Sequence, residues 1–346
     1  MFTPKYHISQ KLLENIKHVA VLIQELNNKS FPSLMTLEFE RRARELSAYS
    51  STSIEGNPLP LTEVKKILKH TPAHIRDTER EVLNYNKALE DLNTLAKSGN
   101  LEISVSLILS IQKKVTEGLL ENHRSGKLRT EPVFVNDPRT RSVAYLPPEV
   151  GEVSQLFSEL VSFSIQNENI LDPLILAGLF HKQFVVIHPF ADGNGRTARL
   201  ASKALLAKMG LDTFNLFSFE NYYNKNVTNY FSKVGLMGNY YDIRDSIDFT
   251  EWLEYFTDGI VDELLRVKKE IENTTQAEQP RIRPELALLI DYARKRGTID
   301  DKEYSELTKR AKSTRTLDFK HLVEQGFFER EGKGKNTFYR LKKDDK

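Results

Sequence analysis

The chain has 346 residues, of which 39% are hydrophobic and 28% are charged, a balance typical of a globular protein with a sizeable core. Its net charge of +2 is too small to dictate a partner, and the absence of cysteine excludes disulfides and thiolate metal sites. The N-terminus has no apolar signal core and no apolar run reaches membrane-spanning length, so we expect a cytoplasmic protein without membrane contact.

Apolar residues recur at helical spacing through the first third of the chain, which predicts a series of core helices. They are expected at about 8–27, 33–50, 62–68, 78–97 and 105–119, with Thr62 capping the third. Between the second and third lies Ser51-Thr-Ser-Ile-Glu55-Gly56-Asn57-Pro58, which reads as a helix end. Because an exposed acid at a helix C-terminus is unfavourable by about 0.3–1 kcal/mol, Glu55 is expected to have a cationic partner elsewhere.

Residues 128–148 change character. The apolar triplet 133–135 and the segment 142–145 flank Asn136-Asp137-Pro138-Arg139, which predicts a β-hairpin in an otherwise helical chain. An isolated hairpin is marginally stable, so it must lie on the helical body or pair with another segment. Asp172-Pro173 then begins a helix as cap and first residue, and its apolar character nearly all round predicts a central helix ending before His188.

Residues 188–199 read His-Pro-Phe-Ala-Asp-Gly-Asn-Gly-Arg-Thr-Ala-Arg and lie between this helix and another that continues to Gly210. Gly193-Asn194-Gly195 can turn tightly and present backbone N–H groups at a helix N-terminus, where the helix dipole also favours an anion. Arg196 and Arg199 lie on one side of the first helical turn and could grip phosphate oxygens.

Two further side chains of this segment suit phosphate chemistry. Mg²⁺ usually takes one or two carboxylates together with phosphates and waters, which makes Asp192 a candidate metal ligand. His188 is the nearby side chain whose ordinary pKa suits a proton acceptor near neutral pH. The combination at this spacing predicts a site for a magnesium-bound phosphate compound.

The segment resembles the signature of Fic domains, His-x-Phe-x-Asp/Glu-Gly-Asn-Gly-Arg-x-x-Arg, and matches every fixed position. The resemblance implies a protein adenylyltransferase that moves AMP from ATP to a Ser, Thr or Tyr hydroxyl of a target protein or of itself. His188 would be the base, Phe190 would seat the loop, and Asp192 would bind Mg²⁺. The backbone of 193–195, which includes Asn194, would cradle the phosphates that Arg196 and Arg199 hold. A related branch transfers phosphate and has lysine in place of the second glycine, so Gly195 argues against that branch.

The same resemblance gives a meaning to the helix end at 51–57, which is similar to the Ser/Thr-x-x-x-Glu-Gly/Asn inhibitory motif of one class of Fic proteins. It implies that Glu55 pairs with Arg199 and occupies the space of the ATP γ-phosphate, supported by Ser51. In some family members the equivalent glutamate also helps to remove AMP from the target, which leaves a de-AMPylase as an alternative.

The resemblance also assigns the hairpin and the aromatic residues that follow the signature. The hairpin would be a flap at 131–146 whose edge takes the target segment as an added strand. Its residues Val133, Phe134, Val135 and Asn136 are candidate nucleotide contacts, and so are Tyr230 and Phe231 for the adenosine, although these aromatics could equally be core.

The last part of the chain has a different pattern. Three short helices, the third capped by Ser313, precede a hairpin over 326–341, and this order resembles a winged-helix domain. From Arg281 onward 18 Lys/Arg face 12 Asp/Glu, a surplus of six that leaves −4 for the first 280 residues. Basic residues surround the third helix (Lys309, Arg310, Lys312, Arg315 and Lys320), so DNA and protein are both candidate partners of 281–346.

These observations predict a mainly α fold: a Fic-type helical bundle with a β-hairpin flap, followed by a small winged-helix (α+β) domain. We expect an N-terminal helical region at 1–110, a catalytic core at 111–265, a linker at 266–280 and the winged helix at 281–346. The alternatives to an auto-inhibited AMP transferase are a winged-helix DNA-binding regulator with a nucleotide-sensing Fic domain, and a phosphotransferase. The target protein and the subunit number, including a homodimer, stay open.

Overall fold

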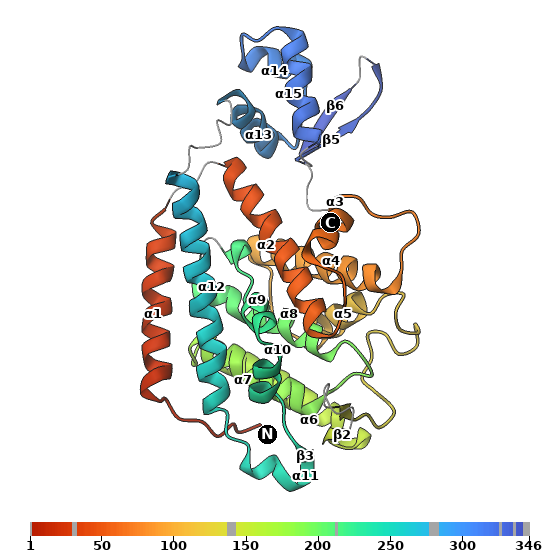
Figure 1. The fold of residues 1–346 in the computed structure, drawn as a ribbon, viewed down its shortest axis with the longest axis vertical. Helices are drawn as coiled ribbons and strands as arrows, with labels where there is room; N and C mark the ends of the chain where they lie inside the picture. The colour runs from red at the N-terminus through yellow and green to blue at the C-terminus, as the bar shows by residue number, and fades with distance from the viewer. Residues whose placement is uncertain are drawn as a thin grey trace. The chain divides into compact units, whose positions relative to one another are not determined.

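The computed structural model describes residues 2–29, 33–136, 143–211, 214–276, 284–324, 327–334 and 337–341 (Figure 1). The described part is mainly helical with two small sheets, which confirms the predicted fold class. The chain divides into unit 1, residues 1–28 and 43–267, and unit 2, residues 29–42 and 268–346. Within the described helices, none combines the length and the apolar character needed to cross a membrane.

Unit 1 contains most of the helices. They are α1 (Gln10–Asn27), the later part of α2 (Ser33–Ile54), α3 (Leu61–Lys69), α4 (Asp77–Lys97), α5 (Val105–Val115), α6 (Val150–Asn167), α7 (Pro173–Ile187), α8 (Asn194–Leu206), α9 (Glu220–Lys225), α10 (Val227–Val234), α11 (Tyr240–Ile243) and the earlier part of α12 (Thr250–Gln276). Short 3₁₀ turns follow α8, precede α9 and follow α11. Figure 1 shows α1 running alongside α12, where Asn15 donates hydrogen bonds to Thr257 and Asp258.

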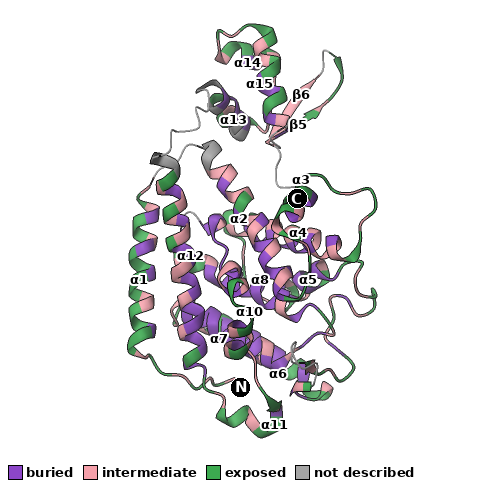
Figure 2. Cartoon of the chain, viewed as in Figure 1, coloured by how far each residue is buried: buried purple, intermediate pink, exposed green. Residues whose placement is uncertain are grey.

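Helices α7 and α8 form the centre of unit 1. They pack against each other, α6 packs on α7, and α4 and α5 pack on α8. Figure 2 shows both helices coloured as buried along almost their whole length. Asp172 caps α7 by accepting a hydrogen bond from the N–H of Leu174, with Pro173 as first residue, as predicted. A Cβ on Gly178 would meet Leu253 at 2.6 Å, so glycine allows α12 to approach α7 closely.

The predicted flap hairpin is present, with short strands. Strand β1 (Val135–Asn136) pairs antiparallel with β2 (Val143–Leu146), while the predicted turn at 137–139 lies outside the described residues. Strand β3 (Gly238–Asn239) adds to the other side of β2 in parallel, giving the order β1-β2-β3. The buried Tyr145 donates a hydrogen bond to the carbonyl of Val186, which attaches the hairpin to the end of α7. The marginal hairpin is thus stabilised both by a third strand and by the helical body.

Unit 2 folds around its own core. Its elements from residue 284 onward are α13 (Pro284–Arg296), β4 (Thr298–Asp300), α14 (Asp301–Leu307), α15 (Lys312–Glu324), β5 (Phe328–Glu331) and β6 (Phe338–Leu341). The three strands form an antiparallel sheet in the order β4-β6-β5, and β4 was not predicted. Tyr304, Phe319 and Leu322 are central in the core that these elements share.

Several predicted boundaries differ from the structure. Thr62 and Ser313 are wrong as caps, because α3 begins at Leu61 after Pro60 and α15 begins at Lys312. The carbonyls of Pro60 and Ala311 already accept the first hydrogen bonds of these helices. Helix α5 ends at Val115 rather than near residue 119, and α12 continues to Gln276, through most of the expected linker at 266–280.

Candidate active site

The signature loop connects α7 to α8, and its first residue has an unusual backbone. His188 has φ 50° and ψ 60°, and its N–H donates to the carbonyl of Phe184 to close the last turn of α7. It is the one non-glycine residue with positive φ in the described part of the chain. Such a conformation costs about 1–3 kcal/mol and persists where the surroundings fix it, as at many functional sites.

Packing and hydrogen bonds fix the loop beyond His188. Phe190 is fully buried and contacts the rings of Phe157 and Phe184 edge-on or tilted. Asn194 closes the loop, because its amide accepts from the N–H of Phe190 at 2.9 Å and donates to the carbonyl of Phe190 at 2.8 Å. The Asn194 side chain therefore holds the loop, and only its backbone remains for the expected phosphate contact.

His188 is partly exposed as a residue, but its Nδ1 is buried and makes no hydrogen bond among the described residues. Burial lowers the pKa of His188 to about 4, while the nearby backbone carbonyl of Val185 and the carboxylates of Glu55 and Asp192 act in the opposite direction. The ring is therefore neutral at neutral pH, the state in which imidazole can accept a proton.

The glycines form the start of α8. Gly193 has φ 77°, and a Cβ there would lie 2.9 Å from Cγ2 of Thr116, so both conformation and space require glycine. The buried Gln112 of α5 donates to the carbonyl of Asp192 at 3.0 Å and accepts from the N–H of Gly126, which fixes the loop from the opposite side. The first N–H groups of a helix have no partner within the helix, so an anion site at the start of α8 stays a prediction that this geometry allows.

Arg199 is fully buried and bonded to the end of α2. Its Nε donates to Oγ of Ser51 at 2.7 Å, and its Nη2 donates to the carbonyl of Ser51 at 2.8 Å and to Oε1 of Glu55 at 2.6 Å. Burial by itself would lower the pKa of Arg199, but the carboxylate of Glu55 raises it above its ordinary value. The structure thus places Glu55 and Ser51 against Arg199, as the resemblance implied.

The backbone after α2 explains why Glu55 points to this position. Gly56 has φ 94°, its N–H donates to Ser53, and the N–H of Asn57 donates to Thr52, the hydrogen-bond pattern of a Schellman motif with Gly56 in the left-handed position. Glu55 is then the residue at the C-cap. The carbonyl of Ser51, which lacks an intrahelical partner here, receives the bond from Arg199 instead.

The carboxylate of Glu55 also lies against the glycine turn. A Cβ added to Gly195 would be 2.1 Å from Oε1 of Glu55 and 3.2 Å from Nη1 of Arg199. Oε1 is therefore in contact with the Cα of Gly195 at the start of α8. A negative side chain here takes the place that the helix N-terminus offers to an anion.

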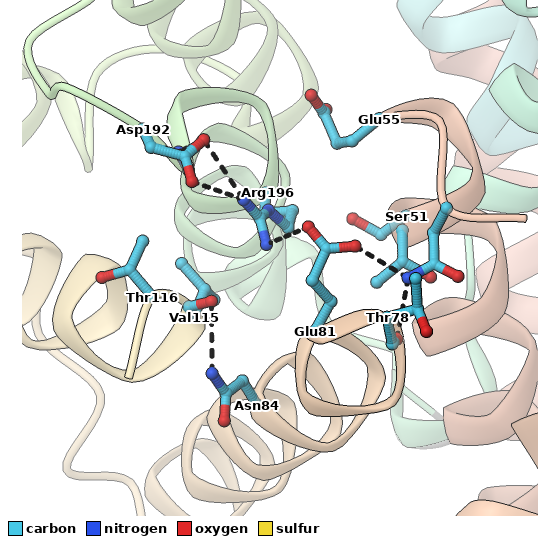
Figure 3. Close-up of polar contacts among 12 residues, drawn as sticks. Ser51, Glu55, Thr78, Glu81, Asn84, Val115, Thr116, Asp192 and Arg196 are labelled. Carbon is cyan, nitrogen blue, oxygen red and sulfur yellow. Dashed lines mark hydrogen bonds and ion pairs between the residues drawn. The ribbon is translucent and has the colours of Figure 1, made fainter. Parts of the chain in front are cut away.

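The other signature arginine is paired as well. Arg196 is 3% exposed and lies between Asp192 and Glu81 of α4 (Figure 3). Its Nη1 donates to Oε1 of Glu81 at 2.9 Å, and its Nη2 contacts the carboxylate of Asp192 at 3.2 Å. Oε2 of Glu81 accepts from the side chain of Asn57 at 2.7 Å, so Glu81 connects Arg196 to the turn that carries Glu55.

This arrangement, a base in the left-handed region followed by a glycine turn and two paired arginines, can be compared with known proteins. Residues 102–206 match the sequence model of the Fic/DOC family. The chain contains a Fic domain. Two relatives named protein adenylyltransferase Fic are 29% identical over 208 residues (Aedes aegypti) and 31% identical over 166 residues (Nematostella vectensis). They cover 59% and 47% of this chain, which spans 40% and 37% of their own length.

Solved structures agree on the fold. A Fic family protein from Desulfovibrio desulfuricans G20 superposes with a TM-score of 0.66 at 19% identity, over 98% of both chains. A Fic domain containing signaling protein from Bacteroides thetaiotaomicron gives 0.59 at 21% identity, over 72% of this chain and 95% of that one. At these identities the comparison supports the fold alone.

The expected nucleotide contacts outside the signature differ in exposure. In the flap of the Fic domain, Phe134 is 60% exposed and Asn136 is exposed, while Val133 and Val135 are partly buried. The exposure of a side chain does not show whether it contacts a nucleotide, so these four contacts stay predictions.

The two aromatic candidates on α10 also differ. Tyr230 is buried, and its hydroxyl lies 3.0 Å from Nε2 of His181 and 3.5 Å from Nη1 of Arg199. Burial raises the pKa of Tyr230 to about 12, so it is a neutral part of the core beside the arginine. Phe231 is partly exposed.

Asp192 is the one carboxylate of the Fic signature that could bind a metal ion. Among the described residues there is no cluster of three or more His, Asp or Glu that could hold a metal ion by itself. The side chain of Asp192 is 53% exposed at the mouth of the loop. A single accessible carboxylate fits Mg²⁺, which is commonly bound by one or two carboxylates plus substrate phosphates.

Four residues outside the signature proved important for this geometry. The sequence predicted no role for Glu81, for Gln112 or for Arg129, whose Nε donates to the carbonyl of His188 at 2.9 Å. It gave Asn57 only as part of a helix end. Glu81 ends the charged run Glu79-Arg80-Glu81, a pattern typical of a solvated segment. A carboxylate spaced to reach an arginine 115 positions later has no local signal.

Proposed function

We propose that this protein transfers AMP from ATP to a hydroxyl of a target protein, and of itself, and that Glu55 inhibits the reaction. The observation that carries the proposal is the position of the Glu55 carboxylate, bonded to Arg199 and in contact with Gly195. A carboxylate there substitutes for a phosphate at a site built for one. The names of the curated relatives support AMP transfer as the reaction.

In the proposed reaction His188 accepts the proton of the acceptor hydroxyl. The acceptor oxygen forms a bond to the α-phosphorus of ATP, the bond from that phosphorus to the bridging oxygen breaks, and pyrophosphate leaves. The N–H groups at the start of α8 would bind phosphate oxygens, and Arg196 and Arg199 would hold the β- and γ-phosphates. A triphosphate beside His188 raises the pKa of the imidazole from its low value toward neutrality, which strengthens the base.

Asp192 is the residue that would hold Mg²⁺. When bound, the ion would neutralise phosphate charge and orient the phosphates for displacement. Asp192 accepts from Arg196 in the present structure, so ion binding and release of that arginine would be linked.

Inhibition follows from the charges. With Glu55 in place, Nη2 of Arg199 donates to its carboxylate and is not free to bind phosphate. The triphosphate would also meet a like charge at Gly195. Both effects oppose ATP binding and disappear when the carboxylate is removed.

The sheet order indicates where a target segment would add. Because β1 and β3 flank β2 in the sheet that the described residues form, β1 (Val135–Asn136) is the hairpin strand at its edge. An added strand is positioned by main-chain hydrogen bonds, which fixes the register of the acceptor hydroxyl without reading its neighbours. The target is therefore defined here only as an extended segment with a Ser, Thr or Tyr.

The test separates the reactions by the phosphate that is retained. The parent protein, Glu55→Gly and the double variant Glu55→Gly/His188→Ala are incubated with ATP labelled at the α- or the γ-phosphate, and protein-bound label is counted. We expect α-label on Glu55→Gly, less on the parent, and about 10²–10⁴-fold slower labelling of the double variant. Transfer of γ-label, or equal labelling by all three proteins, would exclude the proposal.

For residues 281–346 the contact with DNA or protein stays a prediction. Among the five basic residues near α15, Arg310 pairs with the buried Asp318 at 3.1 Å, and Arg315 pairs with Asp301 at 2.9 Å. This lowers the positive charge available to a phosphate backbone. Titration with duplex DNA at 50 and 200 mM salt would decide, because DNA binding must weaken steeply with salt.

A further inference from the structure

Arg129, between α5 and the flap, is buried in an unusual way. It is 5% exposed and donates three side-chain hydrogen bonds, all to backbone carbonyls. Nε donates to His188 at 2.9 Å, Nη1 to Glu131 at 3.3 Å, and Nη2 to Pro148. Its own backbone N–H donates to the carbonyl of Pro189 at 2.9 Å.

No carboxylate lies within ion-pair distance of Arg129 in the described ranges, so the charge is solvated by carbonyl dipoles alone. Burying a cation in this way is costly, and burial accordingly lowers the pKa of Arg129. An apolar side chain could fill the same volume without this cost. The rigid fork of donors is therefore what this position requires.

The three carbonyls belong to functionally different segments. His188 carries the base in the left-handed conformation, Glu131 precedes β1, and Pro148 follows β2. One guanidinium thus joins the peptide after the base to both ends of the hairpin. Neither the signature nor the flap contains Arg129, and no other feature of the sequence assigns it a role.

We propose that Arg129 is a positioning residue that holds the His188 peptide and the two ends of the flap in one fixed geometry, so that the base faces the acceptor hydroxyl of a docked segment. This rests on the proposed function for its catalytic meaning. Arg129 does not touch the reacting atoms and acts through His188 and the flap. Misplacing a catalytic group by about 1 Å can cost about 100-fold in rate.

The positive charge of Arg129 also affects the pKa of the His188 imidazole. The charged groups that face the imidazole are Glu55 from the end of α2, Asp192 from the signature loop, and Arg129. Burial is the main cause of the low pKa of His188. The backbone carbonyl of Val185 and the two carboxylates raise this pKa, and Arg129 lowers it. Removing the cation should therefore raise the pKa of His188.

The test uses the Glu55→Gly protein as background and compares Arg129→Gln with Arg129→Lys. Arg124→Gln is the matched control, because Arg124 is 39% exposed and its ion pair with Glu131 at 3.8 Å does not involve His188. For each protein we would measure the Kd of MgATP, the kcat of AMP transfer, the Tm, and the pKa of His188 by ring-proton NMR.

For Arg129→Gln we expect kcat to fall about 100-fold, with an unchanged Kd for MgATP and a raised pKa of His188. Arg129→Lys keeps the charge but loses the fork, so we expect a kcat about tenfold lower and a His188 pKa close to the parent. The control should match the parent in all four measurements.

A variant that lowers Tm while the folded fraction keeps the parent kcat and His188 pKa would overturn the proposal, because Arg129 would then be structural only. Loss of folding in both Arg129 variants would lead to the same conclusion. If Glu55→Gly transfers no AMP at all, the proposed function fails, and the NMR titration still decides whether Arg129 controls His188.

Discussion

Replacing Glu55 with glycine removes the carboxylate that is bonded to Arg199, the arginine expected to bind phosphate. Its bond to Arg199 is short, 2.6 Å, and the arginine is fully buried. A hydrogen bond to a charged group contributes about 1.5–3 kcal/mol. A triphosphate must break this bond before it can engage Arg199, so that free energy is subtracted from its binding. Removing Glu55 should therefore strengthen MgATP binding about 10- to 150-fold.

The assay is calorimetric titration of MgATP into the parent, Glu55→Gly and Glu55→Gln, with labelling from α-labelled ATP in parallel. Glu55→Gln keeps the shape and loses the charge, so we expect an intermediate affinity. Without nucleotide, Glu55→Gly should have a lower Tm than the parent, because Arg199 loses a partner while it stays buried. Lower stability together with tighter binding distinguishes a blocking contact from a purely structural one.

Glu168→Gly is the matched control. Glu168 is also a helix C-cap residue with an ion pair, to Lys208 at 2.7 Å, but it belongs to α6. Its replacement should leave the affinity for MgATP unchanged. An affinity of Glu55→Gly within twofold of the parent would refute the inhibitory role of this contact.

Three other changes follow from the same geometry. Glu81→Gln weakens the ion pair between Glu81 and Arg196 and should raise the affinity for MgATP several-fold in the same titration. An unchanged Kd would show that this ion pair does not affect binding. Gly195→Ala should lower the Tm of the parent more than that of Glu55→Gly, because its Cβ would collide with the Glu55 carboxylate, and equal losses in the two backgrounds would contradict this position of Glu55. His188 is neutral in the folded protein, with a pKa of about 4 against an ordinary 6.5, so the folded state binds fewer protons than the unfolded chain. The free energy of unfolding should therefore fall by about 2 kcal/mol between pH 7 and pH 5. His188→Asn should remove that part of the loss in denaturant unfolding, since asparagine tolerates the left-handed backbone without titrating.

The sequence predicted those parts of the site that are local. The glycine turn, the two arginines on one helical turn, and the Asp172-Pro173 start of α7 each follow from residues within a few positions of one another. Such features are governed by backbone conformation and helix geometry, which short segments determine. The pairing of Glu55 with Arg199 came from the resemblance to Fic proteins, since 144 residues separate the two in the chain.

The parts that could not be predicted depend on tertiary packing. Glu81 and Arg129 have ordinary neighbours in the sequence, and their roles appear only when α4 and the flap are placed beside the signature loop. Strand β3 has two residues and no apolar alternation, so its pairing with β2 leaves no pattern to read. The wrong cap at Thr62 has a similar cause, because the backbone carbonyl of Pro60 begins the helix without a capping side chain.

Mass spectrometry of the protein after incubation with MgATP tests the central claim most directly. We expect Glu55→Gly to carry an added AMP on a Ser, Thr or Tyr side chain, the parent to carry much less, and Glu55→Gly/His188→Ala to carry almost none. An added phosphate instead of AMP, or an unmodified Glu55→Gly protein that still binds MgATP, would contradict AMP transfer by His188 under the control of Glu55.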